Sequence, residues 1–206
     1  IRTVYHGLPK GLIKPTTSKG AYFAFLGRIC PEKRVDRAIK IALEMKTPIK
    51  IAAKVDQVDK TYFHDEIEPL LKNTYVEYIG EIGEGEKEDF LSNAIALLFP
   101  IDWPEPFGLA MIEAMACGVP VIAYRRGSVP EIIEEGVTGY IVDTFEEAIK
   151  AAQKVGSIDR QKCRQKFEEK FTADRMAQDY ISTYEKIIRD KEVKKRPNQN
   201  FQVTTN

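Results

Sequence analysis

The sequence predicts an α/β fold in which helices cover a parallel, doubly wound β-sheet. Short apolar segments alternate along the chain with longer segments of helical periodicity, as in successive strand–helix units. The segment at residues 21–26, A-Y-F-A-F-L, is apolar at nearly every position, as expected for a strand covered on both faces. Polar turns at residues 27–33, 100–108 and 125–131 follow expected strands, and such sheets bind ligands at the carboxyl ends of their strands.

The elements are expected in the following order. Residues 2–8 read as a short strand, and a Pro- and Lys-bearing linker runs from there through Lys19. Further strands are expected at residues 21–26, 49–55, 76–80, 95–99, 121–124 and 139–142. Helices are expected at residues 32–45, 62–71, 84–94, 130–136, 145–155, 160–170 and 172–189, and another begins near Gly108. Thr172 is the expected N-cap of the last helix, and residues 191–206 read as a loose tail or a strap over a neighbouring domain.

Composition limits the possible partners. The 206 residues are 43% hydrophobic and 30% charged, which predicts a soluble globular domain with or without appendages. Basic and acidic residues number 31 each, so no net charge favours nucleic acid or acidic lipid, and no nucleic-acid partner is expected.

The cysteines and the start of the chain indicate where in the cell the protein is located. Cys30, Cys117 and Cys163 are odd in number and lack metal-ligand spacing, so they are interpreted as small buried residues of a protein in a reducing compartment. No apolar run reaches the ~18 residues of a membrane span. These features predict a cytoplasmic location. The N-terminus has neither an initiator Met nor a signal peptide, so we expect the chain to begin partway through a longer protein.

The stretch at residues 105–123, E-P-F-G-L-A-M-I-E-A-M-A-C-G-V-P-V-I-A, is the candidate active site. Glu105 and Glu113 are separated by seven residues, and Gly108 lies between them at an expected helix start. Backbone N–H groups at Gly108 and Leu109 would face an anion there. Glu113 lies among apolar residues, and a largely buried acid needs a partner. A carboxylate accepts hydrogen bonds from vicinal hydroxyls, so a hexose or a ribose is a natural ligand.

The turn at residues 27–33, G-R-I-C-P-E-K, offers the complementary charges. Gly27 allows a sharp turn, Arg28 presents a planar fork of donors for phosphate oxygens, and Lys33 adds a point charge. The alternative is that Arg28 and Lys33 are solvated or pair with Glu32 or Asp36. The sequence contains neither G-x-G-x-x-G nor G-x-x-x-x-G-K-[ST], which argues against a dehydrogenase or a P-loop NTPase.

These two stretches, with G-S-V-P-E-I-I at residues 127–133 and E-E-G-V-T-G-Y-I-V at residues 134–142, resemble the C-terminal domain of retaining glycosyltransferases of family 4. That family has the GT-B fold, in which two Rossmann-like domains face each other across a cleft, and the second domain binds the nucleotide-sugar donor. The resemblance covers residues 21–142 and continues more weakly to residue 189. It implies an interdomain strand and linker at residues 1–19, a nucleotide-sugar-binding domain at 20–170, a crossover helix at 171–190 and a tail at 191–206.

The resemblance also implies a role for each motif residue. Arg28 and Lys33 would bind the donor diphosphate, and Glu105 would contact the donor sugar near the reacting centre. The other donor-binding positions are Gly27, Phe107, Gly108 and Leu109 at the sugar and phosphates, Glu113 at the ribose hydroxyls, and Gly80, Glu81 and Ile82 at the base. The donor would be a UDP- or GDP-sugar, transferred with retention and without a metal, a cofactor or a protein nucleophile.

Some features depart from the family pattern. A glycine-rich turn is common after the second strand, but here residues 52–56 read A-A-K-V-D, so Lys54 is either a donor-site cation or an exposed lysine. Arg125 and Arg126 are expected to face water rather than the cleft. His6 and His64 are expected to have no catalytic role.

By the resemblance, we expect the first domain of the GT-B pair to lie outside this sequence. The acceptor site, and any association with a membrane surface, would belong to that domain, and the acceptor is unknown. The alternatives are a non-catalytic nucleotide-sugar-binding domain or another GT-B enzyme, such as a nucleotide-sugar epimerase or a phosphorylase. No lysine context for a phosphorylase cofactor is found.

Overall fold

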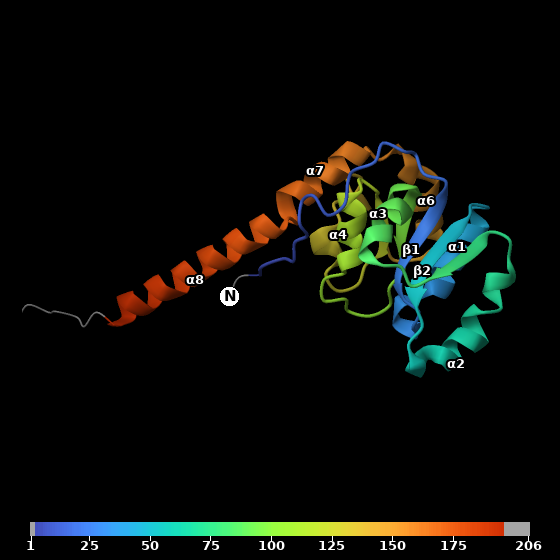
Figure 1. Cartoon of the computed structure of the whole chain (residues 1–206), viewed down its shortest axis with the longest axis horizontal. Helices are drawn as coiled ribbons and strands as arrows, with labels where there is room; N and C mark the ends of the chain where they lie inside the picture. Colours follow the sequence, from blue (N-terminus) through green and yellow to red (C-terminus); the bar gives the residue numbers. More distant parts are fainter. Residues whose placement is uncertain (1–2, 196–206) are drawn as a thin grey trace, which may run out of the picture.

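A computed structural model of the chain describes residues 3–195 (Figure 1). This part contains a six-stranded parallel sheet with the strand order β3-β2-β1-β4-β5-β6. The strands are β1 (Tyr22–Arg28), β2 (Ile49–Lys54), β3 (Val76–Gly80), β4 (Ala94–Phe99), β5 (Val121–Tyr124) and β6 (Gly139–Val142). From β1 the chain adds β2 and β3 toward one edge of the sheet, and from β4 it adds β5 and β6 toward the other edge. The crevice between the carboxyl ends of β1 and β4 is therefore the switch point of a doubly wound sheet, as predicted.

Helices cover both faces of the sheet. The α-helices are α1 (Val35–Glu44), α2 (Lys60–Tyr62), α3 (Glu84–Ser92), α4 (Leu109–Ala116), α5 (Val129–Ile132), α6 (Phe145–Lys154), α7 (Arg160–Lys170) and α8 (Ala173–Lys195). Shorter turns are the 3-10 helices η1 (Pro31–Lys33), η2 (Gln57–Asp59), η4 (Leu70–Lys72) and η5 (Val155–Ser157), and the π-helix η3 (Phe63–Ile67). Helices α1 and α6 pack on one face, and α3, α4 and α7 pack on the other. Burial on both faces explains why β1, β4 and β5 are apolar along most of their length.

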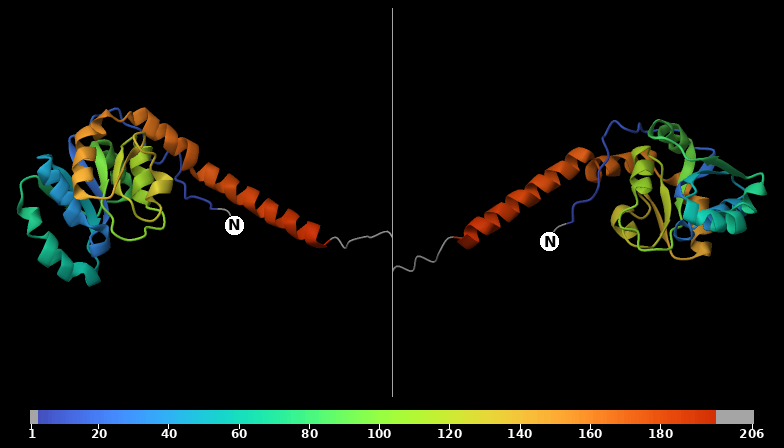
Figure 2. Two further views of the ribbon diagram at one scale, coloured as in Figure 1. Left: turned by 180° about the vertical axis from the view of Figure 1, so that it is seen from behind. Right: turned by 60° about the horizontal axis from the view of Figure 1, so that its bottom comes forward.

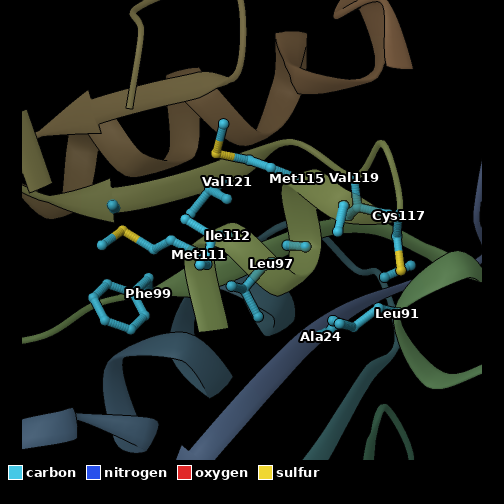
Figure 3. Packing of buried hydrophobic residues seen from close by; sticks show 14 of the residues in the cluster. Ala24, Leu91, Leu97, Phe99, Met111, Ile112, Met115, Cys117, Val119 and Val121 are labelled. Atoms are coloured by element: carbon cyan, nitrogen blue, oxygen red, sulfur yellow. The ribbon is translucent and has the colours of Figure 1, made fainter. Parts of the chain in front are cut away.

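Helix α4 is buried in one of the two cores. Met111, Ile112 and Met115 pack among side chains of β4, β5 and neighbouring segments (Figure 3). In the described part of the chain Cys30, Cys117 and Cys163 are all buried free thiols, as predicted, and burial raises the pKa of Cys117 and of Cys163 to about 12. This core fixes the position of α4, and with it the candidate site.

The predicted N-terminal strand is wrong over the part of it that the structure describes. Residues 3–7 form no strand, and Leu8 makes only an isolated bridge with Thr172. The segment instead runs across the junction of α7 and α8, where Leu8 N donates to Phe171 O and Ala173 N donates to Leu8 O, each at 2.9 Å. Gly7 is required at this crossing, because a Cβ there would lie 2.2 Å from the Thr172 carbonyl oxygen.

Two predicted helices are interrupted. The helix expected at residues 32–45 is split by Arg34, which has a left-handed φ of +54° between η1 and α1. The helix expected at residues 62–71 breaks into α2, η3 and η4. Pro69 would clash with the carbonyl four residues before it in a continuous α-helix, and Glu68 N instead donates to Phe63 O at 2.8 Å, a π-type bond.

The last helix is longer than predicted. Thr172 Oγ1 accepts a hydrogen bond from Arg175 N at 3.3 Å, which confirms the N-cap, but α8 continues to Lys195. The tail predicted from residue 191 is therefore wrong for residues 191–195, and residues 196–206 lie outside the described part. Helix α8 extends away from the sheet domain (Figures 1 and 2) and exposes Tyr180, Ile181, Tyr184, Ile187 and Ile188. Within residues 3–195, none of the helices is both long enough and apolar enough to cross a bilayer.

Candidate functional site

A cleft of about 550 Å³ opens at the carboxyl ends of β1, β2 and β4, beside the start of α4. Its lining includes the predicted residues Gly27, Lys33, Glu81, Ile82, Glu105, Phe107, Gly108, Leu109 and Glu113. It also includes His6, Lys54 and Lys87, which were not assigned to the site. Arg28 and Gly80 lie outside the lining. The structure therefore brings together most of the predicted positions in one cavity at the switch point.

The start of α4 faces this cleft. Gly108 has a left-handed φ of +83°, and a Cβ there would lie 2.6 Å from Met111 Cε. Within the described residues no side chain caps the helix, and its first turn has no acidic residue. Leu109 and Ala110, the first residues of the helix, line the cleft. Met111 N already donates to Gly108 O at 3.0 Å, so the N–H groups of Leu109 and Ala110 and the positive end of the helix dipole are those available to an anion.

Lys33 and Glu105 form an ion pair at the cleft. Lys33 Nζ lies 2.5 Å from Glu105 Oε2, and Trp103 Nε1 donates to the same oxygen at 3.0 Å. The ammonium lies 5.5 Å from the centroid of the Trp103 ring, a cation–π distance. The side chains are 22% and 11% exposed, so the pair is partly shielded from water but can still be reached by a ligand. Lys33 thus pairs with Glu105 rather than with Glu32 or Asp36.

Asp102 connects the loop that carries Glu105 to the turn that carries Lys33. It accepts hydrogen bonds from Arg34 at 3.1 Å, Arg37 at 3.3 Å and Arg126 at 3.2 Å. Asp102 N also donates to Glu32 O at 2.8 Å. Partial burial acts to raise the pKa of Asp102, but the guanidinium groups outweigh it and hold that pKa below its usual range.

The turn after β5 supports the same loop. Ser128 N donates to Glu105 O at 2.9 Å, and Ser128 Oγ donates to Phe107 O at 2.8 Å. Gly127 has φ +52° and touches the Glu105 backbone so closely that a Cβ would lie 2.2 Å from its carbonyl oxygen. The two arginines expected to face water are about half exposed, but both are paired: Arg126 with Asp102 and Arg125 with Asp143.

Glu113 has the partner that its burial requires. It is 7% exposed, and its Oε1 lies 2.8 Å from Lys87 Nζ. Lys87 also pairs with Glu84, one turn earlier on α3. Sequence reasoning predicted that Glu113 needs a partner but did not find Lys87. Its one signal was a lone lysine in the acidic stretch E-G-E-K-E-D.

Arg28 lies at the rim and is bound to an acid there. Its Nη1 lies 3.2 Å from Asp56 Oδ2, and Lys54 Nζ lies 3.0 Å from Asp56 Oδ1. Lys54 and Arg28 together hold the pKa of Asp56 below its usual range. Lys54 lines the cleft, and its side chain is also more than half exposed. Both sequence alternatives, a cation at the site and an exposed lysine, therefore describe it.

The histidines occupy different environments. The His6 ring lies 4.9 Å from the Phe107 ring, edge to face, in the wall of the cleft. His64 pairs with Glu68 at the surface, away from the site. Among the described residues no group of three or more His, Cys, Asp or Glu is arranged to hold a metal ion.

A doubly wound sheet with an uncapped helix start and a cleft at its switch point defines an α/β domain of the Rossmann-like class. The family model for glycosyl transferases group 1 matches residues 13–173, and the chain therefore belongs to that family. The match includes every predicted site residue and ends at the start of α8.

Curated relatives extend beyond this chain. An uncharacterised 41.2 kDa protein in the cps region of Klebsiella pneumoniae is 33% identical over 170 residues, which are 78% of this chain and 45% of that protein. The N-acetyl-alpha-D-glucosaminyl L-malate synthase of Bacillus anthracis is 33% identical over 136 residues, which are 59% of this chain and 34% of the enzyme. The chain thus spans less than half the length of these relatives.

Solved structures share the fold. HepE of Anabaena in complex with UDP and glucose superposes with a TM-score of 0.75 at 19% identity, covering 90% of this chain and 57% of that one. The C-terminal domain of a group 1 glycosyl transferase from Francisella tularensis gives a TM-score of 0.68 at 20% identity, covering 81% of this chain and 100% of that domain. The sheet therefore matches a Rossmann-like domain of GT-B glycosyltransferases.

Proposed function

We propose that this chain is the donor-binding domain of a retaining glycosyltransferase of family 4. It binds a nucleoside-diphosphate sugar, from which the whole protein transfers the sugar to an acceptor. One observation carries the proposal: the cleft joins the uncapped start of α4 to two lysine–glutamate pairs within the described residues. Cations and helix N–H groups suit a diphosphate, and the carboxylates suit hydroxyls.

The site divides into a nucleoside part and a sugar-phosphate part. Glu81 and Ile82 line the side where the base binds, and Glu113 accepts from the ribose hydroxyls. The diphosphate binds Lys33 and the start of α4, while Glu105 and Phe107 contact the donor sugar. Positive charge at Lys33 and at the helix start stabilises the leaving diphosphate electrostatically, so the reaction proceeds without a metal or a protein nucleophile.

Arg28 joins the diphosphate only after an exchange of partners. In the structure its guanidinium is bound to Asp56, at the rim of the cleft. A diphosphate oxygen replaces that carboxylate, because phosphate and carboxylate accept from the same fork of donors. The site is therefore completed by the ligand.

The remaining parts of the activity belong to the longer protein. The acceptor binds in a preceding Rossmann-like domain, and α8 returns to that domain. The apolar side chains that α8 exposes between Tyr180 and Ile188 support this role, since a helix that stays in water rarely carries such a stripe. The donor is a UDP- or GDP-sugar, with UDP supported by the HepE complex, in which the bound nucleotide is UDP.

Calorimetric titration tests the proposal. The 206-residue chain should bind at least one of UDP, GDP, ADP or the matching nucleotide sugars, with the sugar nucleotide and its diphosphate competing for one site. No binding of any of them at millimolar concentration would overturn the proposal.

A lysine variant tests the diphosphate assignment. Lys33→Ala should weaken UDP by about 10- to 100-fold, because it removes a charge-assisted contact, while uridine binding changes less than about twofold. Lys72→Ala is the matched control, since Lys72 is exposed and lies outside the cleft. Equal losses for UDP and uridine would contradict the assignment.

A further inference from the structure

Lys87 is a cleft residue that the motifs do not include. Its Nζ lies 2.8 Å from Glu113 Oε1 and also contacts the Glu84 carboxylate. The Lys87 and Glu113 side chains are only 17% and 10% exposed, yet both line the cleft. A buried ion pair that can be reached from a binding cavity is a feature of a site rather than of a solvated surface.

The position of Lys87 is fixed by the start of α3. Gly83 N donates to Glu86 Oε2 at 2.8 Å, which closes the first turn of the helix. Lys87 follows within the next turn and reaches across to α4. The same β3–α3 turn carries Glu81 and Ile82 into the cleft. Lys87 therefore links the β3–α3 turn, where the base is expected to bind, to Glu113, where the ribose is expected to bind.

The ion pair also keeps Lys87 positively charged. Burial acts to lower the pKa of Lys87, but the hydrogen bonds to Glu113 and Glu84 outweigh it, so that pKa is raised and the lysine stays charged. An ionised carboxylate beside a charged lysine is an acceptor only. With Oε1 held by Lys87, the other oxygen of Glu113 remains for hydroxyl donors in the cleft.

We propose that Lys87 is a positioning residue that orients Glu113 to accept from the vicinal hydroxyls of a ribose, and so sets the preference of the site for ribonucleotides over deoxyribonucleotides. The inference rests on the proposed function. Without Lys87, Glu113 is a nearly buried carboxylate with no cation beside it. Without that cation nothing holds the carboxylate in place, so it turns toward water and no longer presents its free oxygen to the diol.

The test compares UDP with 2′-deoxy-UDP by calorimetry on the 206-residue chain, with GDP and 2′-deoxy-GDP used in place of this pair if GDP is the nucleotide that binds. The wild type should favour the ribonucleotide by about tenfold, the value of one hydrogen bond to a charged group. Lys87→Met should reduce this preference to about threefold or less. Lys87→Arg should retain most of it, because it keeps a charged donor. Lys72→Met should change the ratio less than about twofold, since Lys72 is exposed and lies outside the cleft.

The outcomes separate the inference from the function on which it rests. A folded Lys87→Met variant with an unchanged ribose preference, or with equal losses for UDP and 2′-deoxy-UDP, would overturn the positioning role and leave the proposed function standing. A wild type that binds no nucleotide would overturn the function itself. If Lys87→Met does not fold by circular dichroism, Lys87→Gln replaces it, because it loses the charge but stays polar, and the same reduced preference is expected.

Discussion

Two lysine–glutamate pairs line the cleft in the described part of the chain, and they are held in different ways. Lys33–Glu105 and Lys87–Glu113 have similar exposure and lengths of 2.5 and 2.8 Å. Glu105 lies on the loop after β4 and depends on hydrogen bonds from remote segments. Glu113 lies inside α4, where the helix and the core around it fix its backbone.

Because they are held differently, the two pairs should be sensitive to different substitutions. The loop pair depends on Asp102, which accepts hydrogen bonds from Arg34 beside Lys33 and from Arg126, and on the turn at Gly127. The helix pair depends on one contact between α3 and α4. Changes to the network should therefore move Glu105 and leave Glu113 in place.

Gly127→Ala should give the largest effect. Its Cβ would lie 2.2 Å from the Glu105 carbonyl oxygen, so the backbone of the loop must move. We expect a loss of about 2–4 kcal/mol in the free energy of unfolding and at least tenfold weaker UDP binding, with the ribose preference retained. Urea unfolding and calorimetry measure the two.

Gly136→Ala is the control for that substitution. Gly136 also has a positive φ, of +73°, but nothing lies within 4 Å of its Cβ position. It should lose only about 1 kcal/mol, the cost of the left-handed backbone alone. Equal losses in the two variants would mean that contact with Glu105 is unimportant.

A double-mutant cycle compares the loop pair with an exposed one. Lys33→Met and Glu105→Gln, alone and together, should show a coupling of about 1–3 kcal/mol in the free energy of unfolding, because the pair is mostly shielded. The cross-strand pair Lys50–Glu77, at 3.2 Å and with side chains 35% and 58% exposed, should show less than about 0.5 kcal/mol. A larger coupling for the exposed pair would contradict this account.

The same comparison shows what could be predicted from sequence. The alternation of strands and helices predicted the parallel sheet, and the bounds of β5, β6 and α7 agree with the structure, because apolar runs and helix signals are local. Glu105 and Lys33 were found because each lies in a dense motif. Lys87 was missed because its contact with Glu113 is tertiary, and one lysine in an acidic helix resembles a solvated residue.

The errors of prediction have the same origin. The break at Arg34 depends on its hydrogen bonds with Asp36 and with Asp102, which lies far along the chain. The N-terminal segment is held by the α7–α8 junction and not by the sheet. The pairing of Arg28 with Asp56 is likewise not indicated by any sequence pattern, whereas the role of Arg28 at a diphosphate stays a prediction. Local patterns predict elements, whereas the partners of charged side chains depend on the assembled fold.

Asp102→Asn should have a moderate, pH-dependent effect. The pKa of Asp102 is lowered in the folded state, so its stabilisation is complete above the unfolded-state pKa of about 3.9 and is lost as the pH falls through the folded-state pKa. We expect the variant to be less stable by about 1 kcal/mol at pH 7 and to approach the wild type near pH 3. Urea midpoints at both pH values measure this.

Asp143→Asn is the control for the Asp102 network. Asp143 pairs with Arg125, both are about half exposed, and neither touches the Glu105 loop. Its loss should stay below about 0.5 kcal/mol at pH 7. A loss as large as that of Asp102→Asn would show that the network adds nothing beyond an ordinary surface pair.

Asp56→Asn should have the smallest effect, and it should strengthen UDP binding rather than weaken it. Asp56 accepts from Arg28 and Lys54 at the rim, so it competes with a diphosphate for both cations. Removing its charge should tighten UDP binding by about two- to fivefold, within the range of an exposed ion pair, and the gain should shrink as salt is raised. Asp190→Asn on α8 removes the same charge far from the cleft and should leave the affinity unchanged. Weaker UDP binding by Asp56→Asn would contradict this competition. It would mean that Asp56 holds Arg28 and Lys54 in place for the ligand, so that the rim is preorganised in the same way as the loop that carries Glu105.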